Sequence, residues 1–189
     1  MSTIGPVIRS CSLLLLGILA SGCASTPSQM VRATGTPQLE SGKALVTFLR
    51  PSSYGGAVSF GIWDSEQFVG ELKGKTSVSY LASPGEHVFF AKAENWAVTK
   101  ATLAAGKRYY VLMRPRMGLM KAGVIMDPVK SSTPDAEIEG WQRESPLFAP
   151  DPAKVEAYTR EWLPQVRKAI ENYNAGKADF NLLEAGDGR

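Results

Sequence analysis

The chain has 189 residues, of which 44% are apolar, and 21 basic and 18 acidic side chains give a formal net charge of +3. This composition is typical of a folded domain and excludes a disordered tail protein, a multi-pass membrane protein and a collagen-like fibre. Two cysteines and one histidine exclude a disulfide-dense scaffold and leave almost nothing for a His/Cys site, so we expect no metal and no cofactor. Nucleic-acid binding usually requires a clustered basic face, and the small net charge gives no indication of one. We therefore expect no nucleic-acid partner.

The first 22 residues have the features of an export signal. Arg9 is the only charged side chain before the apolar run Leu13–Ala20, and a small residue, Gly22, directly precedes Cys23. The unbroken apolar run is shorter than the roughly 20 residues that cross a bilayer, which favours a cleaved signal over an uncleaved membrane anchor. We therefore expect residues 1–22 to be removed on export.

The end of this segment, Leu19–Cys23, resembles the lipobox of bacterial lipoproteins. The resemblance implies cleavage between Gly22 and Cys23 and a lipid anchor on the Cys23 sulfur, with acyl chains such as palmitate. The alternative is a free or disulfide-bonded thiol, but Cys11 would leave with the signal. By resemblance to Gram-negative lipoproteins, Ala24 implies sorting to the outer membrane, facing the periplasm. The inner membrane and the cell surface stay open.

The next two regions differ in pattern. Residues 23–43 are rich in Ser, Thr, Pro and Gly, which predicts a flexible tether with a reach of roughly 25 Å, either a spacer or a stretch of no selected length. Residues 44–127 contain seven or eight short runs separated by turn residues, which predicts a small antiparallel β-sandwich. Ala44–Arg50 is apolar at nearly every position, as in a strand covered on both faces, whereas Ala57–Trp63 alternates.

Four short motifs occur in order along the predicted sandwich. They are Arg50-Pro51, Gly70-Glu71-Leu72, Pro84-Gly85-Glu86-His87 and Gly106-Lys107-Arg108-Tyr109-Tyr110. In these motifs, residues 44–114 resemble the bacterial DUF2846 family of envelope lipoproteins. The resemblance implies a small β-sandwich. Because that family has no established activity, the resemblance carries over no site residue.

The remainder of the chain predicts a connector and a helix. Residues 128–150 contain several prolines and no sustained period, which predicts an extended connector across the sandwich. Residues 151–175 predict an amphipathic helix that Asp151 caps, with apolar residues recurring every three or four positions. Pro164 predicts a kink or a split in this helix. Its apolar stripe either docks on the chain's own sandwich or binds a partner, and residues 176–189 are too mixed for a prediction.

Candidate catalytic residues are few. His87 is the only histidine and directly follows a turn, where a solvated side chain at a strand edge is expected. No Gly-x-Ser-x-Gly nucleophile elbow and no phosphate-binding loop occur, and the acidic residues are scattered. The sequence therefore predicts a protein that is not an enzyme, with a hydrolase as a distant alternative.

Two sets of side chains are candidates for a contact surface. Four rings on strand-like segments could stack on a cell-wall glycan or a lipid, namely Trp63, Trp96, Tyr109 and Tyr110. Arg114 and Arg116 lie in a methionine-rich segment that suits an adaptable apolar contact beside an anionic lipid or protein, although a core strand with basic ends gives the same pattern. We expect a structural or protein-interaction module of the cell envelope that has a protein partner, with a module that binds cell-wall glycan or lipid as the alternative.

Overall fold

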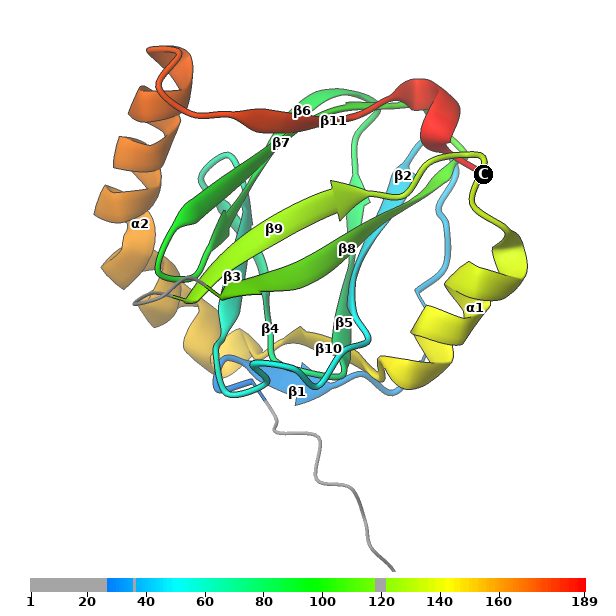
Figure 1. Cartoon of the computed structure of the whole chain (residues 1–189), viewed down its shortest axis with the longest axis horizontal. Coiled ribbons are helices and arrows are strands. Elements are labelled where there is room, and N and C mark those ends of the chain that lie inside the picture. Colours follow the sequence, from blue (N-terminus) through cyan, green and yellow to red (C-terminus); the bar gives the residue numbers. More distant parts are fainter. Residues whose placement is uncertain (1–26, 36, 118–121) are drawn as a thin grey trace, which may run out of the picture.

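The computed structural model describes residues 27–35, 37–117 and 122–189. The chain is mainly β, as predicted, and its strands form two facing sheets (Figure 1). Neighbouring strands of the first sheet are, in order, β1 (Met30–Arg32), β10 (Leu147–Pro150), β5 (Thr76–Ala82), β2 (Ala44–Arg50), β8 (Arg108–Met117) and β9 (Ala122–Pro128). Those of the second sheet are β11 (Phe180–Leu183), β7 (Trp96–Leu103), β6 (Gly85–Lys92), β3 (Phe60–Asp64) and β4 (Gln67–Leu72).

Both sheets are mixed, so the prediction of a purely antiparallel sandwich is wrong. β2 pairs in parallel with β8, β10 with β5, and β11 with β7, whereas the other pairs are antiparallel. The physical reason lies in the connections. Each parallel partner arrives after a long crossover rather than a hairpin, and a crossover allows the strand to run in the same direction as its neighbour.

Strands also occur where none was expected. β1 lies in the predicted tether, β10 in the predicted connector and β11 in the segment without a prediction. The described part of the tether, residues 27–35 and 37–43, joins the first sheet through β1, whose Met30 is 2% exposed. These strands have three or four residues each, and the neighbouring strand supplies their hydrogen bonds.

The core lies between the two sheets. β2 is buried along its whole length, because Val46 and Phe48 face the main core while Leu49 belongs to a second cluster with Ile138. This confirms the prediction that Ala44–Arg50 is covered on both faces. The covering element on the second face is a helix, α1 (Asp135–Glu144).

The prediction of an extended connector over residues 128–150 is therefore wrong for the part that forms α1. Only Ile138 of this helix is buried. A helix that buries one side chain shows no apolar period in its sequence. Ile138 packs on Leu49 of β2 and Leu112 of β8, with the half-buried Trp141 beside it, and so covers the outer face of these two strands.

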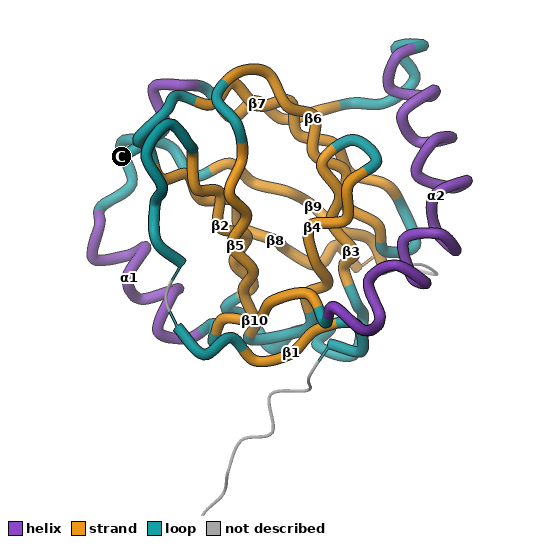
Figure 2. Tube along the Cα trace, turned by 180° about the vertical axis from the view of Figure 1, so that it is seen from behind, coloured by secondary structure: helices purple, strands orange, loops and turns teal. Residues whose placement is uncertain are grey.

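The predicted C-terminal helix is α2 (Pro152–Asn174), with Asp151 accepting a hydrogen bond from the backbone N–H of Ala153 as the N-cap. It is one continuous helix through Pro164, and Figure 2 shows its axis changing direction along its length. Among the described residues, neither helix has the length and the apolarity that crossing a membrane requires.

α2 packs on the outer face of the second sheet. Its Tyr158 ring stacks on the indole of Trp63 in β3, with ring centroids 6.1 Å apart, and Val166 is fully buried. A side chain on Gly61 would come within 2.5 Å of that indole. The missing side chain at Gly61 is therefore what makes room for Trp63 under the helix.

Candidate functional site

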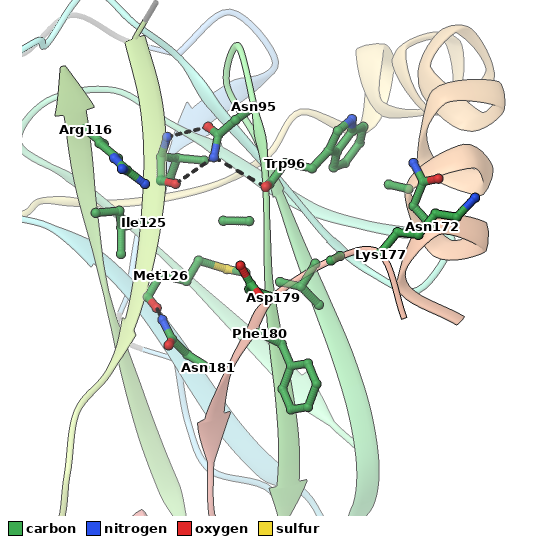
Figure 3. Close-up of a pocket in the computed structure, with 15 residues that line it drawn as sticks. Asn95, Trp96, Arg116, Ile125, Met126, Asn172, Lys177, Asp179, Phe180 and Asn181 are labelled. Carbon is green, nitrogen blue, oxygen red and sulfur yellow. Dashed lines mark hydrogen bonds between the residues drawn. The ribbon is translucent and has the colours of Figure 1, made fainter. Parts of the chain in front are cut away.

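A pocket of about 440 Å³ lies where the last strands of the two sheets approach each other, beside the C-terminal end of α2 (Figure 3). We call it the β11 pocket. β9 and β11 are the end strands of the first and second sheets, so this is the open side of the sandwich. The pocket is lined by Asn95, Trp96, Ala97, Val98, Arg116, Val124, Ile125, Met126, Ala169, Asn172, Lys177, Ala178, Asp179, Phe180 and Asn181.

Two asparagine side chains bond to the outer edge of β9 at the ends of this pocket. Asn95, in the turn between β6 and β7, accepts from the backbone N–H of Val124 at 2.7 Å and donates to the Val124 carbonyl at 3.1 Å. Asn181 of β11 donates to the carbonyl of Met126 at 2.7 Å. The two carboxamides satisfy backbone groups that a neighbouring strand would otherwise bind, and they join the two sheets on this side.

The pocket combines aromatic, carboxamide and charged side chains. Phe180 is 47% exposed, and Leu182, two residues further along β11, is 49% exposed. The carboxamide of Asn172 reaches the pocket from α2, and Lys177 follows that helix (Figure 3). Such a lining can hold an apolar group against a ring and bond to polar groups around it.

Only one of the four predicted rings lines this pocket. Trp96 is half-buried and does line it, with its ring centroid 5.8 Å from that of Trp63, which is fully buried beneath α2. Tyr109 is fully buried in the main core, where its hydroxyl accepts from the N–H of Ala104 and donates to the carbonyl of Ala185. Tyr110 packs instead against the second cluster, which contains Leu49 and Ile138.

The two predicted arginines also separate. Both are exposed, but only Arg116 lines the β11 pocket, while Arg114 bonds to Asp127 at 2.9 Å. The predicted cleavage and lipidation residues, Gly22 and Cys23, lie outside the described residues. Of the six predicted surface residues, the structure therefore brings Trp96 and Arg116 to one pocket.

Sequence reasoning missed the polar residues of the pocket. Asn95 is in a turn, Asn172 is near the end of a helix and Asn181 is in a strand of four residues. No spacing in the sequence connects these positions, because the contacts between β9, β7 and β11 bring them together. The apolar run Phe180–Leu183 is the one local signal that could have indicated β11.

A second polar cluster involves the only histidine. The Nδ1 atom of His87 lies 2.6 Å from a carboxylate oxygen of Asp64, and its Nε2 atom lies 2.8 Å from the carbonyl oxygen of Ser83. Tyr80 donates its hydroxyl to the same oxygen of Asp64 at 3.0 Å. Burial, and next the carboxylate of Asp64, raise the pKa of Tyr80.

This geometry differs from the solvated strand-edge position expected for His87, whose side chain is 14% exposed. Both ring nitrogens face acceptor oxygens, so neither is free to take a proton from a substrate. The cluster joins β3, β5 and the start of β6. Among the residues that the structure describes, no three His, Cys, Asp or Glu side chains are grouped so that they could hold a metal ion.

No protein family matches the chain, and no curated protein is detectably similar to it in sequence. The resemblances to the lipobox and to the DUF2846 family stay predictions.

Proposed function

We propose that the chain is a lipid-anchored protein of the bacterial cell envelope, in the outer membrane and facing the periplasm. In this proposal it acts as a non-enzymatic protein-interaction module. The anchor rests on Cys23 and the residues before it, and the outer-membrane location rests on Ala24. The interaction role rests on one observation, which is that Phe180 and Leu182 are 47% and 49% exposed beside the β11 pocket.

Large apolar side chains beside a pocket are typical of protein contact surfaces, where an aromatic residue often contributes much of the affinity. The partner's segment would place an apolar side chain between Trp96 and Phe180. Its peptide groups would bond to the carboxamide of Asn172, which makes no hydrogen bond to the described part of the chain. Arg116 and Lys177 would favour an acidic segment.

The geometry of His87 supports a role without catalysis. General base catalysis needs a side chain that can accept a proton within reach of the substrate. Both nitrogens of His87 are bonded within the fold, to Asp64 and to Ser83. The surface beside them, which Lys100 and Tyr173 also line, therefore offers a substrate no free imidazole nitrogen.

A second candidate function is binding of a cell-wall glycan in the same pocket. The supporting observation is that the ring of Trp96 lies near the carboxamides of Asn95, Asn172 and Asn181. A flat apolar ring with carboxamides around it suits a sugar, which has apolar faces and hydroxyl edges. The other predicted rings contribute nothing to this surface, so we place this candidate second.

Site-specific photo-crosslinking in intact cells tests the interaction role. A photoreactive phenylalanine analogue at Phe180 should give a discrete crosslinked protein, and the same analogue at Tyr54, which is 61% exposed but outside the pocket, should not. Phe180→Ser should abolish capture from an analogue placed at Leu182. Equal products from Phe180 and Tyr54, together with retention of the purified protein on peptidoglycan, would replace the first candidate by the second.

The anchor has its own test. Wild type should incorporate labelled palmitate, and globomycin, an inhibitor of lipoprotein signal peptidase, should block its processing. Cys23→Ala should incorporate no label and leave the membrane fraction. Unchanged processing and labelling in Cys23→Ala would refute the anchor.

A further inference from the structure

The first residues that the structure describes are close in sequence to the proposed lipid on Cys23. Pro27 is buried, and both the hydroxyl of Ser28 and the backbone N–H of Gln29 donate to a carboxylate oxygen of Glu71, each at 3.1 Å. Pro27 lies four residues after Cys23. Four extended residues span at most about 14 Å, so a lipid on Cys23 holds this part of the fold within that distance of the bilayer.

The first turn of α2 lies directly against the same stretch of chain. The backbone N–H of Asp151 donates to the carbonyl of Gln29 at 2.9 Å, and the ammonium of Lys154 donates to the carbonyl of Ser28 at 3.1 Å. Figure 1 shows β1 and the start of α2 on the same side of the fold. Whatever lies within 14 Å of Pro27 therefore also lies near the start of α2.

An apolar groove of about 640 Å³ runs along α2 from this point. We call it the α2 groove. It is lined by Pro150, Pro152, Val155, Glu156, Thr159, Arg160 and Leu163. Leu163 lies eleven positions after Pro152, which makes the groove about 16 Å long at the rise of an α-helix.

This groove lies beside the helix face that covers the sheet and shares Val155 with it. The face of α2 that packs on the second sheet carries Tyr158, Trp162 and Val166. Leu163 is half-buried and lines only the groove, outside the main core. Among the described residues, the main core therefore does not include Leu163 or the two prolines of the groove, Pro150 and Pro152.

The charges around the groove are paired with each other. Arg160 bonds to Glu156 at 2.6 Å, and Lys154 bonds to Asp151 at 3.3 Å. Paired charges leave little net charge to attract a charged protein surface. The apolar residues between them are the feature that an occupant would contact.

We infer that the α2 groove rests on the bilayer, with its apolar side chains at the boundary between headgroups and acyl chains. This inference rests on the proposed lipid at Cys23. The short link excludes a folded protein from the space beneath, because a domain of 100 residues has a radius of gyration of about 13 Å and is much wider than the available distance. An amphipathic helix that lies in the membrane interface buries its apolar face in this way. The protein is then held by its lipid in one orientation, which keeps the β11 pocket, near the other end of α2, away from the membrane.

Nitroxide labelling of the mature lipidated protein tests this orientation. The protein is placed in vesicles of phosphatidylethanolamine and phosphatidylglycerol, with a label at Thr159→Cys in the groove. The matched control is Ala105→Cys, which is exposed in the turn before β8. The first residue of β8, Arg108, bonds to Arg189 at the C-terminus, and Figure 1 shows the C-terminus across the molecule from β1. The label at residue 159 should lose at least about fivefold of its accessibility to an aqueous nickel chelate on vesicle binding, and the control should not change.

Two variants separate the groove from the anchor. Leu163→Glu should restore nickel accessibility of the label at residue 159, whereas Gln165→Glu, an exposed neighbour on the same helix, should not. Both variants should still float with the vesicles, because they keep the lipid on Cys23. Circular dichroism and the melting temperature confirm that the variants are folded.

The outcomes are distinguishable. A protein whose intact mass shows no lipid and which does not float overturns the proposed anchor. A lipidated protein that floats while the label at residue 159 stays as accessible as the control overturns the docking of the groove alone. Protection of that label in the Cys23→Ala protein without vesicles would assign the groove to a second copy of the chain, and would also overturn the inference.

Discussion

At the scale of single residues, Arg50 shows how a buried cation organises a loop. Its side chain is 0% exposed, donates to the carbonyls of Val58 and Gly55 at 2.5 Å and 2.7 Å, and lies 3.8 Å from the centroid of the Phe60 ring. Burial lowers the pKa of the guanidinium to about 10, so it stays protonated at neutral pH. The loop after β2 is therefore held to the sheet by a charged side chain.

Arg50→Lys should lower the free energy of unfolding by about 2 kcal/mol, because one ammonium cannot reach both carbonyls and leaves an acceptor unsatisfied. Urea denaturation measures the change. Arg114→Lys is the matched control, since Arg114 is exposed, and it should change stability by less than about 0.5 kcal/mol. Equal losses in the two variants would contradict this role for Arg50.

Two tyrosines make the fold sensitive to alkaline pH. Burial and then Asp64 raise the pKa of Tyr80 above its ordinary 10.0, and burial followed by Glu71 and Glu161 does the same for Tyr158. The folded pKa exceeds the unfolded one, so the stabilisation is complete below pH 10 and is lost as the pH rises above it.

Absorbance at 295 nm should show these two tyrosines ionising only as the protein unfolds, after the exposed ones. Tyr80→Phe combined with Tyr158→Phe should make the loss of stability above pH 10 less steep. Tyr54→Phe, at a position 61% exposed, should leave that slope unchanged. The same slope in all three proteins would show that other groups control the alkaline transition.

At the scale of elements, the attachment of α2 depends on a few buried side chains. Val166 is 0% exposed and Ala169 is 4% exposed, whereas Gln165, the residue directly before Val166, is exposed. Val166→Asp should cost at least about 3 kcal/mol, because a carboxylate would be buried without a partner. Gln165→Asp should cost less than about 1 kcal/mol.

Thermal unfolding followed by tryptophan fluorescence measures both variants, since Trp63 lies beneath the helix and Trp162 is on it. A melting temperature of Val166→Asp close to that of Gln165→Asp would mean that α2 contributes little to the stability of the sandwich.

The same elements show what a sequence can predict. Strands β2 to β9 carry apolar or alternating runs bounded by turns, and α2 carries a clear period and an N-cap, so the pattern predicts them. β1, β10 and β11 have three or four residues each, and pairing with a neighbour, which the pattern cannot show, decides their structure. α1 buries only Ile138, so its sequence shows no recurring apolar position from which a helix could be predicted.

The candidate site was less predictable than the fold, for a related reason. Trp96 and Arg116 could be chosen by residue type, but the same choice included Trp63 and Tyr109, which are fully buried. An aromatic residue on a strand fits the core as well as a surface. Asn95 acts through the backbone of β9, a contact that exists only after the two sheets meet.

At the scale of the whole molecule, the C-terminal residues connect parts that are distant in the sequence. Arg108 and Arg189 exchange two backbone hydrogen bonds, at 2.9 Å and 3.0 Å. Arg189 is therefore paired with the first residue of β8. Asp187, which is 5% exposed, accepts from the ammonium of Lys130 at 2.9 Å. The short 3₁₀ helix that carries it, Ala185–Asp187, also accepts the hydroxyl of Tyr109.

Removing residues 185–189 should therefore lower the free energy of unfolding by about 4 kcal/mol, at roughly 1 kcal/mol for each of the four hydrogen bonds named above. Urea denaturation gives this value, and hydrogen exchange should show faster exchange at the start of β8 but not at the β3–β4 hairpin. Glu184→Gln is the control, because that side chain is 70% exposed, and it should stay within about 0.5 kcal/mol of wild type. Uniformly faster exchange would mean that the segment supports the whole sandwich rather than β8, and an unchanged stability would mean that these bonds add nothing to the folded state.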